Sequence, residues 1–185
     1  CGDGSDNDCD GQTDCADTDC AAMCDATGLI FSEYVEGSSN NKALELFNGA
    51  GHAIELAQCR LDRYSNGSMT PTAINLTGTL AVGDTYVLCN SGQTLIGAGV
   101  CDFSASSINH TGNDAYALVC NGSIVDFVGA INATDFGANQ TLRRLCSVAT
   151  GKTATSTMFD ATEWTSPLPS DTVDGLGIRS CPTMP

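Results

Sequence analysis

The sequence is poor in basic residues and in long apolar runs, and each scarcity excludes a class of function. Its 185 residues contain seven lysines and arginines against 22 aspartates and glutamates, which gives a formal net charge of −15 at pH 7. Such a surface repels phosphate backbones, so we expect no nucleic-acid partner. Because the chain has no apolar run long enough to cross a membrane and no signal peptide, we expect a mature exported product without membrane insertion.

Residues and motifs of catalysis are also scarce. The chain has two histidines, His52 and His110, and it contains no G-x-S-x-G, H-E-x-x-H, G-x-x-x-x-G-K-[ST] or G-x-G-x-x-G motif. Glu33, Glu36 and Glu45 fall on neighbouring predicted strands, where we interpret them as surface residues rather than as an acid–base pair. We therefore expect that the protein is not an enzyme.

Cysteine, by contrast, is abundant. Eleven cysteines point to an oxidising compartment, and we expect a secreted, extracellular or cell-surface protein. Cys89 and Cys101 bracket a short loop, and Cys120 and Cys146 lie in two predicted strands, so we expect these four to form disulfides, Cys89 with Cys101 and Cys120 with Cys146. Cys59 and Cys181 are left over, with Cys24 as a further partner from the first segment, and the connectivity stays open at this stage.

The first 25 residues differ from the rest of the chain, because they hold eight aspartates, five cysteines and no lysine, arginine or glutamate. They have almost no apolar side chain for a core, so a bound cation is the physical means of ordering them. From Asp6 onwards, aspartates stand at positions 1, 3, 5, 9 and 12 of a twelve-residue calcium loop, and Gly11 stands at position 6, where the loop turns sharply. We predict one or two Ca²⁺ ions, bound by Asp3, Asp6, Asp8, Asp10, Gln12, Asp14, Asp17 and Asp19.

The spacing D-x-D-x-D-G-x-x-D-x-x-D with interleaved cysteines, over residues 1–20, resembles the thrombospondin type 3 repeat. The resemblance implies a disulfide-stapled calcium segment without regular secondary structure. Position 12 is Asp17 rather than the glutamate of an EF-hand loop, and no helix-forming run flanks the segment, so a helix–loop–helix pair is disfavoured.

After residue 27 the composition changes to short apolar and β-branched runs separated by turns rich in glycine, asparagine and serine. Asn121-Gly122 between two such runs is a hairpin signal. The predicted strands cover residues 29–36, 43–48, 53–56, 59–65, 72–76, 85–90, 115–120, 123–128 and 141–146. This pattern predicts an all-β, antiparallel β-sandwich over residues 28–185, preceded by the calcium segment at residues 1–27.

The sandwich part resembles the lamin tail domain in its bacterial extracellular form. The resemblance is carried by LIFSEYVEGSSNNKALELFN, CRLDRYSNG, GTLAVGDTYVLCNSG, GNDAYALVCNGSIVDFVG, TLRRLCSV and a late EW, and it covers residues 28–177. It implies an immunoglobulin-like sandwich that serves as a binding or assembly module, in some relatives appended to a nuclease. Trp164, in the EW pair, is expected to be a packing residue.

Six of the twelve asparagines begin an N-x-[ST] triplet, which makes them candidate N-glycosylation sites and covalent glycans candidate partners. They are Asn66, Asn75, Asn109, Asn121, Asn132 and Asn139.

Two hypotheses of function stand close together at this stage. The first is a non-enzymatic extracellular structural protein, a calcium-stabilised subunit that assembles head-to-tail with copies of itself into a surface filament or fibril. The second is a calcium-stabilised adhesion or glycan-binding module that binds surface carbohydrate and is held on a rigid spacer. A third, an accessory domain of a secreted nuclease, requires a catalytic partner that this chain does not contain.

Overall fold

The computed structural model describes residues 24–132, 134–179 and 181. All eight predicted calcium ligands precede residue 24 and lie outside the described residues. The described residues form a β-sandwich with three short 3₁₀ turns, η3 (Leu56–Gln58), η4 (Ser65–Gly67) and η5 (Ala161–Glu163).

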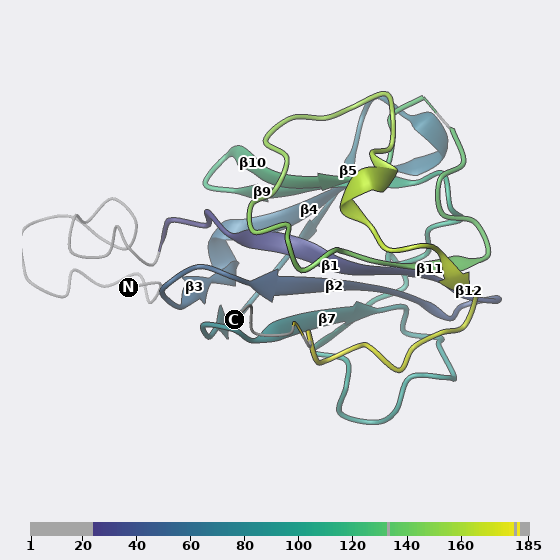
Figure 1. Ribbon diagram of the computed structural model, residues 1–185, viewed down its shortest axis with the longest axis horizontal. Coiled ribbons are helices and arrows are strands. Elements are labelled where there is room, and N and C mark those ends of the chain that lie inside the picture. The colour runs from purple at the N-terminus through teal and green to yellow at the C-terminus, as the bar shows by residue number, and fades with distance from the viewer. Residues whose placement is uncertain (1–23, 133, 180, 182–185) are drawn as a thin grey trace, which may run out of the picture.

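Two sheets make up the sandwich, and Figure 1 shows the four-stranded sheet lying above the six-stranded one. The six-stranded sheet has the order β12 (Leu168–Pro169), β11 (Gln140–Arg143), β1 (Leu29–Glu36), β2 (Lys42–Asn48), β7 (Thr85–Cys89), β8 (Phe103–Ser104). The four-stranded sheet has the order β10 (Ser123–Val128), β9 (Ala115–Cys120), β4 (Cys59–Tyr64), β5 (Thr72–Asn75). A small pair, β3 (Ile54–Glu55) with β6 (Thr79–Leu80), completes the strands, and all described pairings are antiparallel except β7 with β8.

The predicted fold class is confirmed, and each predicted strand has a counterpart. β1, β9 and β10 have the predicted bounds, whereas β11 ends at Arg143 instead of continuing to Cys146. Asn121-Gly122 forms the predicted hairpin turn, with φ angles of 50° and 79° that an Asn-Gly pair adopts at low cost. β6, β8 and β12 were not predicted, because two residues carry no readable alternation.

The main core lies between the sheets, where alternate residues of each strand meet. It contains Phe31, Tyr34, Leu44, Leu61 and Tyr116, each fully or almost fully buried. Trp164 is 6% exposed and packs on the same core, as predicted.

The outer face of the six-stranded sheet is also covered, so β1 is buried along its whole length. Val35, Ala43 and Val87 form a second apolar cluster there with Ile96 and Leu176. Leu176 belongs to residues 170–179, which we call the C-terminal arm. The expectation that Glu33, Glu36 and Glu45 are surface residues is wrong: they are 3%, 7% and 2% exposed. The arm covers Glu33 and Glu45, whereas Glu36 is buried beside Lys42 and Asn139.

Three disulfides join described residues. Cys89 bonds Cys101, the pairing expected from the short loop between them. Cys59 bonds Cys120, its cross-strand partner in the β4–β9 pair, and Cys146 bonds Cys181 beyond the arm. The expected Cys120–Cys146 bridge is therefore wrong, as is a bond from Cys24 to Cys59 or Cys181, because strand register brings Cys120 to Cys59 instead.

One buried ion pair connects the two sheets. Asp126 on β10 and Arg144, just after β11, have side chains with no exposed surface, and Nη1 of Arg144 lies 2.9 Å from Oδ2 of Asp126. The same carboxylate accepts hydrogen bonds from the main-chain N–H groups of Phe31, Phe127 and Lys152 at 2.8–2.9 Å. This satisfies the buried charge and fastens β1, β10 and β11 to one another.

Candidate functional site

A row of charged residues crosses the outer face of the six-stranded sheet. Strand register places Glu33 of β1 between Arg143 of β11 and Glu45 of β2, as direct cross-strand partners. Neighbouring side chains on one face of a sheet are close enough to interact, so this row forms one electrostatic unit.

Each carboxylate of the row has identified donors. Arg143 donates from Nε to Oε2 of Glu33 at 3.1 Å, and its Nη2 pairs with Asp174 of the arm. Glu45 accepts a hydrogen bond from the Ser32 hydroxyl at 2.6 Å through Oε1. Through Oε2 it accepts another from the Gly177 main-chain N–H of the arm at 2.7 Å. The row therefore binds the arm as well as joining three strands.

Burial changes the protonation of this row. It raises the pKa of Glu33 to about 7, against the opposing effect of the Arg143 guanidinium, and Oε1 of Glu33 has no partner among the described residues. Burial also raises the pKa of Glu45, and the hydrogen bonds from Ser32 and Gly177 oppose that rise. Glu33 therefore titrates near neutral pH, which a surface glutamate does not do.

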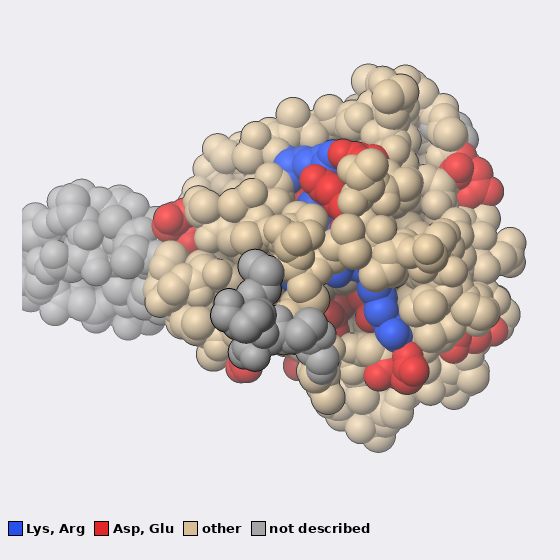
Figure 2. Space-filling model, viewed as in Figure 1, with Lys and Arg blue, Asp and Glu red and all other residues tan. Residues whose placement is uncertain are grey.

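A pocket of about 540 Å³ lies between this row and the arm. Figure 2 shows a hollow on this face with acidic atoms recessed in it and basic atoms along its wall. Gly175 lies so close over the Glu33–Arg143 pair that a Cβ there would approach Oε2 of Glu33 and Nη2 of Arg143 to 2.6 Å. The lining residues that carry charge are Glu33, Glu45, Asp174, Arg143, Arg144 and Arg179.

The guanidinium groups of this pocket are already engaged. Arg144 pairs with Asp126 and Glu163 and lies over the Trp164 ring, 5.1 Å from its centroid. Arg179 donates to the main-chain oxygens of Leu145 and Val148 at 3.1 and 3.3 Å. Most of the charges that line this pocket pair with one another or with the arm, which suits the pocket to holding the arm in place, whereas Nε of Arg144 and Nε of Arg179 have no hydrogen-bond partner among the described residues.

The third glutamate considered from the sequence, Glu36, lies elsewhere. It pairs with the buried Lys42 across the β1–β2 hairpin and accepts a hydrogen bond from the main-chain N–H of Asn139. His110 is fully buried beside Tyr34 and Tyr116, with Nε2 2.7 Å from the Val35 carbonyl oxygen. Burial lowers the pKa of His110 to about 3, so it is a neutral core residue.

No described residues come together as a metal site, since no three His, Cys, Asp or Glu side chains in that part of the chain cluster suitably. The predicted calcium ligands lie outside the described residues.

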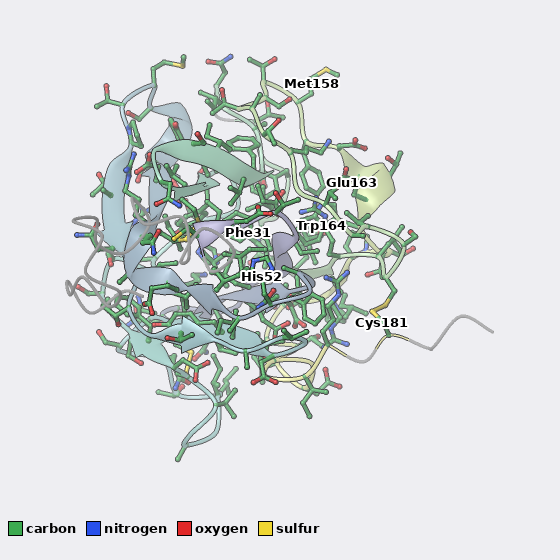
Figure 3. All side chains as sticks on the ribbon, turned by 90° about the vertical axis from the view of Figure 1, so that its left-hand side faces the viewer. Phe31, His52, Met158, Glu163, Trp164 and Cys181 are labelled. Carbon is green, nitrogen blue, oxygen red and sulfur yellow. A yellow bond between two sulfur atoms is a disulfide. The ribbon has the colours of Figure 1, made fainter. Side chains whose placement is uncertain are left out.

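Residues 24–26, which connect the N-terminal segment to the sandwich, are held against the sandwich by hydrogen bonds and burial. Asn121 donates from Nδ2 to the Cys24 carbonyl oxygen at 2.9 Å, and Nε2 of His52 lies 2.7 Å from the Asp25 carbonyl oxygen. Ala26 is 5% exposed and belongs to the main core. Figure 3 looks onto this end of the molecule, with His52 near the middle of the view.

All six N-x-[ST] asparagines are exposed. Three asparagines outside such triplets, Asn41, Asn48 and Asn90, are buried and hydrogen-bonded through their side chains. The candidate glycosylation sites thus lie where a modifying enzyme can reach the asparagine.

A comparison with protein-family models matches residues 24–132, more than half of the chain, to the lamin tail domain. The chain belongs to the lamin tail domain family. The family match spans β1 to β10 of this lamin tail domain, whereas Arg143, Asp174 and Arg179 of the charged pocket follow the matched residues. A comparison with curated proteins returned no match.

Within the described part of this lamin tail domain protein, no helix is both long and apolar enough to span a bilayer.

Proposed function

We propose that this lamin tail domain protein is a non-enzymatic, extracellular structural subunit that assembles head-to-tail into a surface filament. In this proposal residues 1–25, ordered by one or two Ca²⁺ ions, contact the sandwich of the next copy. The contact is heterologous, so it propagates as a fibre rather than closing as a two-fold dimer.

The anchored exit of the chain is the observation that carries the proposal. Hydrogen bonds from Asn121 and His52 and the burial of Ala26 hold residues 24–26 against the end of the sandwich. A segment that begins from a held point has a restricted direction, so the entropy lost on docking with another copy is reduced. A flexible tether between the segment and the sandwich would need no such contacts.

Calcium is proposed as the ordering agent because the aspartate spacing matches a calcium loop and the segment has almost no apolar residues. At about 1 mM external calcium and a dissociation constant of about 10⁻⁴ M, each ion would contribute about 1–2 kcal/mol of ordering. The extracellular location is supported by the three disulfides among the described residues, since such bonds persist in oxidising compartments.

The ion pairs of the sandwich support a structural role over a catalytic one. Asp126 with Arg144, between the sheets, and Glu33 with Arg143, beneath the arm, fasten strands and the arm. A subunit under load in a filament benefits from such cross-links, together with the Cys146–Cys181 disulfide just beyond the arm.

Negative-stain electron microscopy of the full chain, in 2 mM calcium and in excess chelator, tests the proposal. We expect fibres in calcium and single particles in chelator. Asp8→Asn/Asp10→Asn removes two predicted ligands and should abolish the fibres. Asp84→Asn/Asp135→Asn, which removes the same charge from exposed turns of the sandwich, should leave them intact. Single particles in both conditions would overturn the proposal.

A further inference from the structure

The four-stranded sheet has two edges, and they are protected differently. Along β10, Gly151 lies so close that a Cβ there would meet the Val125 carbonyl oxygen at 2.2 Å, so a neighbouring segment covers that edge. β5 pairs only with β4 among the described strands, and three of its four residues are exposed. β5 is therefore an open edge.

An open edge strand is a site where a second chain can pair, and proteins usually protect it with charge, proline or a bulge. The four residues of β5, Thr-Ala-Ile-Asn, carry no charge. Pro71 precedes the strand rather than interrupting it. β5 therefore has little of the usual protection within its own sequence.

Asn75, the last residue of β5, begins one of the six N-x-[ST] triplets. Its side chain is exposed and makes no hydrogen bond to a described residue, and the Thr77 that completes the triplet is also exposed. Two of the other triplets have a residue that is engaged in the folded protein. The Nδ2 of Asn121 donates to the Cys24 carbonyl oxygen, and Thr141, which completes the Asn139 triplet, is fully buried and bonded to the Thr172 carbonyl oxygen.

We infer that Asn75 is N-glycosylated and that its glycan blocks pairing of the β5 edge with other copies. This inference rests on the export proposed above. The donor is a lipid-linked oligosaccharide. Nδ2 of Asn75 forms a bond to the anomeric carbon, the bond from that carbon to the lipid pyrophosphate breaks, and the pyrophosphate leaves with the electron pair while Nδ2 loses one proton. A branched polar chain at the end of a four-residue strand excludes another strand from its open side.

The modification is tested on protein purified from the organism that makes it. Non-reducing intact mass and tandem mass spectrometry of the peptide containing Asn75 should show a hexose-containing addition on that residue. A peptide carrying only unmodified Asn75 would overturn the inference.

The role of the glycan is tested with Asn75→Gln made in the same organism and studied in chelator, where no calcium-dependent fibres are expected. Sedimentation velocity should show a shift from monomer to larger species for Asn75→Gln. The matched control, Thr134→Ala, removes the Asn132 triplet just after β10, at the other edge of the four-stranded sheet, and should remain monomeric. A monomeric Asn75→Gln would overturn the blocking role. Failure of calcium-dependent fibre formation is a separate result, because both tests here are done without calcium.

Discussion

Replacing Asp126 by alanine tests whether one buried carboxylate joins the two sheets. The substitution removes the partner of Arg144, whose side chain has no exposed surface, and leaves three main-chain N–H groups without their acceptor. Breaking a buried pair by removing one member costs about 3–5 kcal/mol. Since small domains are stable by only about 5–15 kcal/mol, we expect Asp126→Ala to lose about 4 kcal/mol and to remain only marginally folded.

The measurement is urea unfolding at pH 7 with disulfides intact, followed by the fluorescence of the buried Trp164. Arg144→Met should cost less than Asp126→Ala, because the Asp126 carboxylate keeps its three main-chain donors. Arg60→Ala is the matched control: it breaks an Arg–Asp pair in which the arginine side chain is 42% exposed, and it should cost at most about 1 kcal/mol. A loss below about 1 kcal/mol for Asp126→Ala would refute the reasoning.

Three further predictions follow from the same structure. The Glu33 pKa of about 7 exceeds its ordinary value of 4.5, so the folded state holds a proton that the unfolded state releases between these values. The free energy of unfolding therefore falls by up to about 3 kcal/mol as pH rises through that window, relative to that of Glu33→Gln. Equal changes in the urea midpoints of the two proteins between pH 4 and pH 8 would contradict this. His110 has the opposite effect: its folded pKa of about 3 lies below the ordinary 6.5, so stability is lost as pH falls below 6.5. In His110→Gln, the urea midpoint should therefore decrease less as pH is lowered below 6.5. Cys146→Ser/Cys181→Ser removes a disulfide between residues 35 positions apart and should lower the free energy of urea unfolding by about 2–4 kcal/mol. Amide hydrogen exchange in the C-terminal arm should become faster. Unchanged exchange there would show that the other contacts hold the arm without the disulfide.

The strands were predictable because each is a local pattern. Alternation over four to eight residues, as in β2, and a turn pair such as Asn121-Gly122 are readable within a short window of sequence. The Cys89–Cys101 bond was predictable for the same reason, because the two cysteines are only twelve positions apart in the sequence.

The charged row and the buried ion pair were not predictable, because each depends on long-range register. Glu33 and Arg143 are 110 residues apart in sequence and meet only through the β1–β11 pairing. The arm that buries Glu33 and Glu45 has few apolar residues, so nothing in its composition indicated that it covers a sheet face. An alternating strand with an apparently solvent-facing glutamate reads the same whether or not a later segment covers it.

Sedimentation velocity of the intact chain across a calcium titration from chelator to 5 mM tests the central claim most directly. The account predicts a monomer in chelator and a progressive shift to polydisperse, fast-sedimenting polymers as calcium rises, reversed by adding chelator. A single monomeric species at every calcium concentration would contradict it.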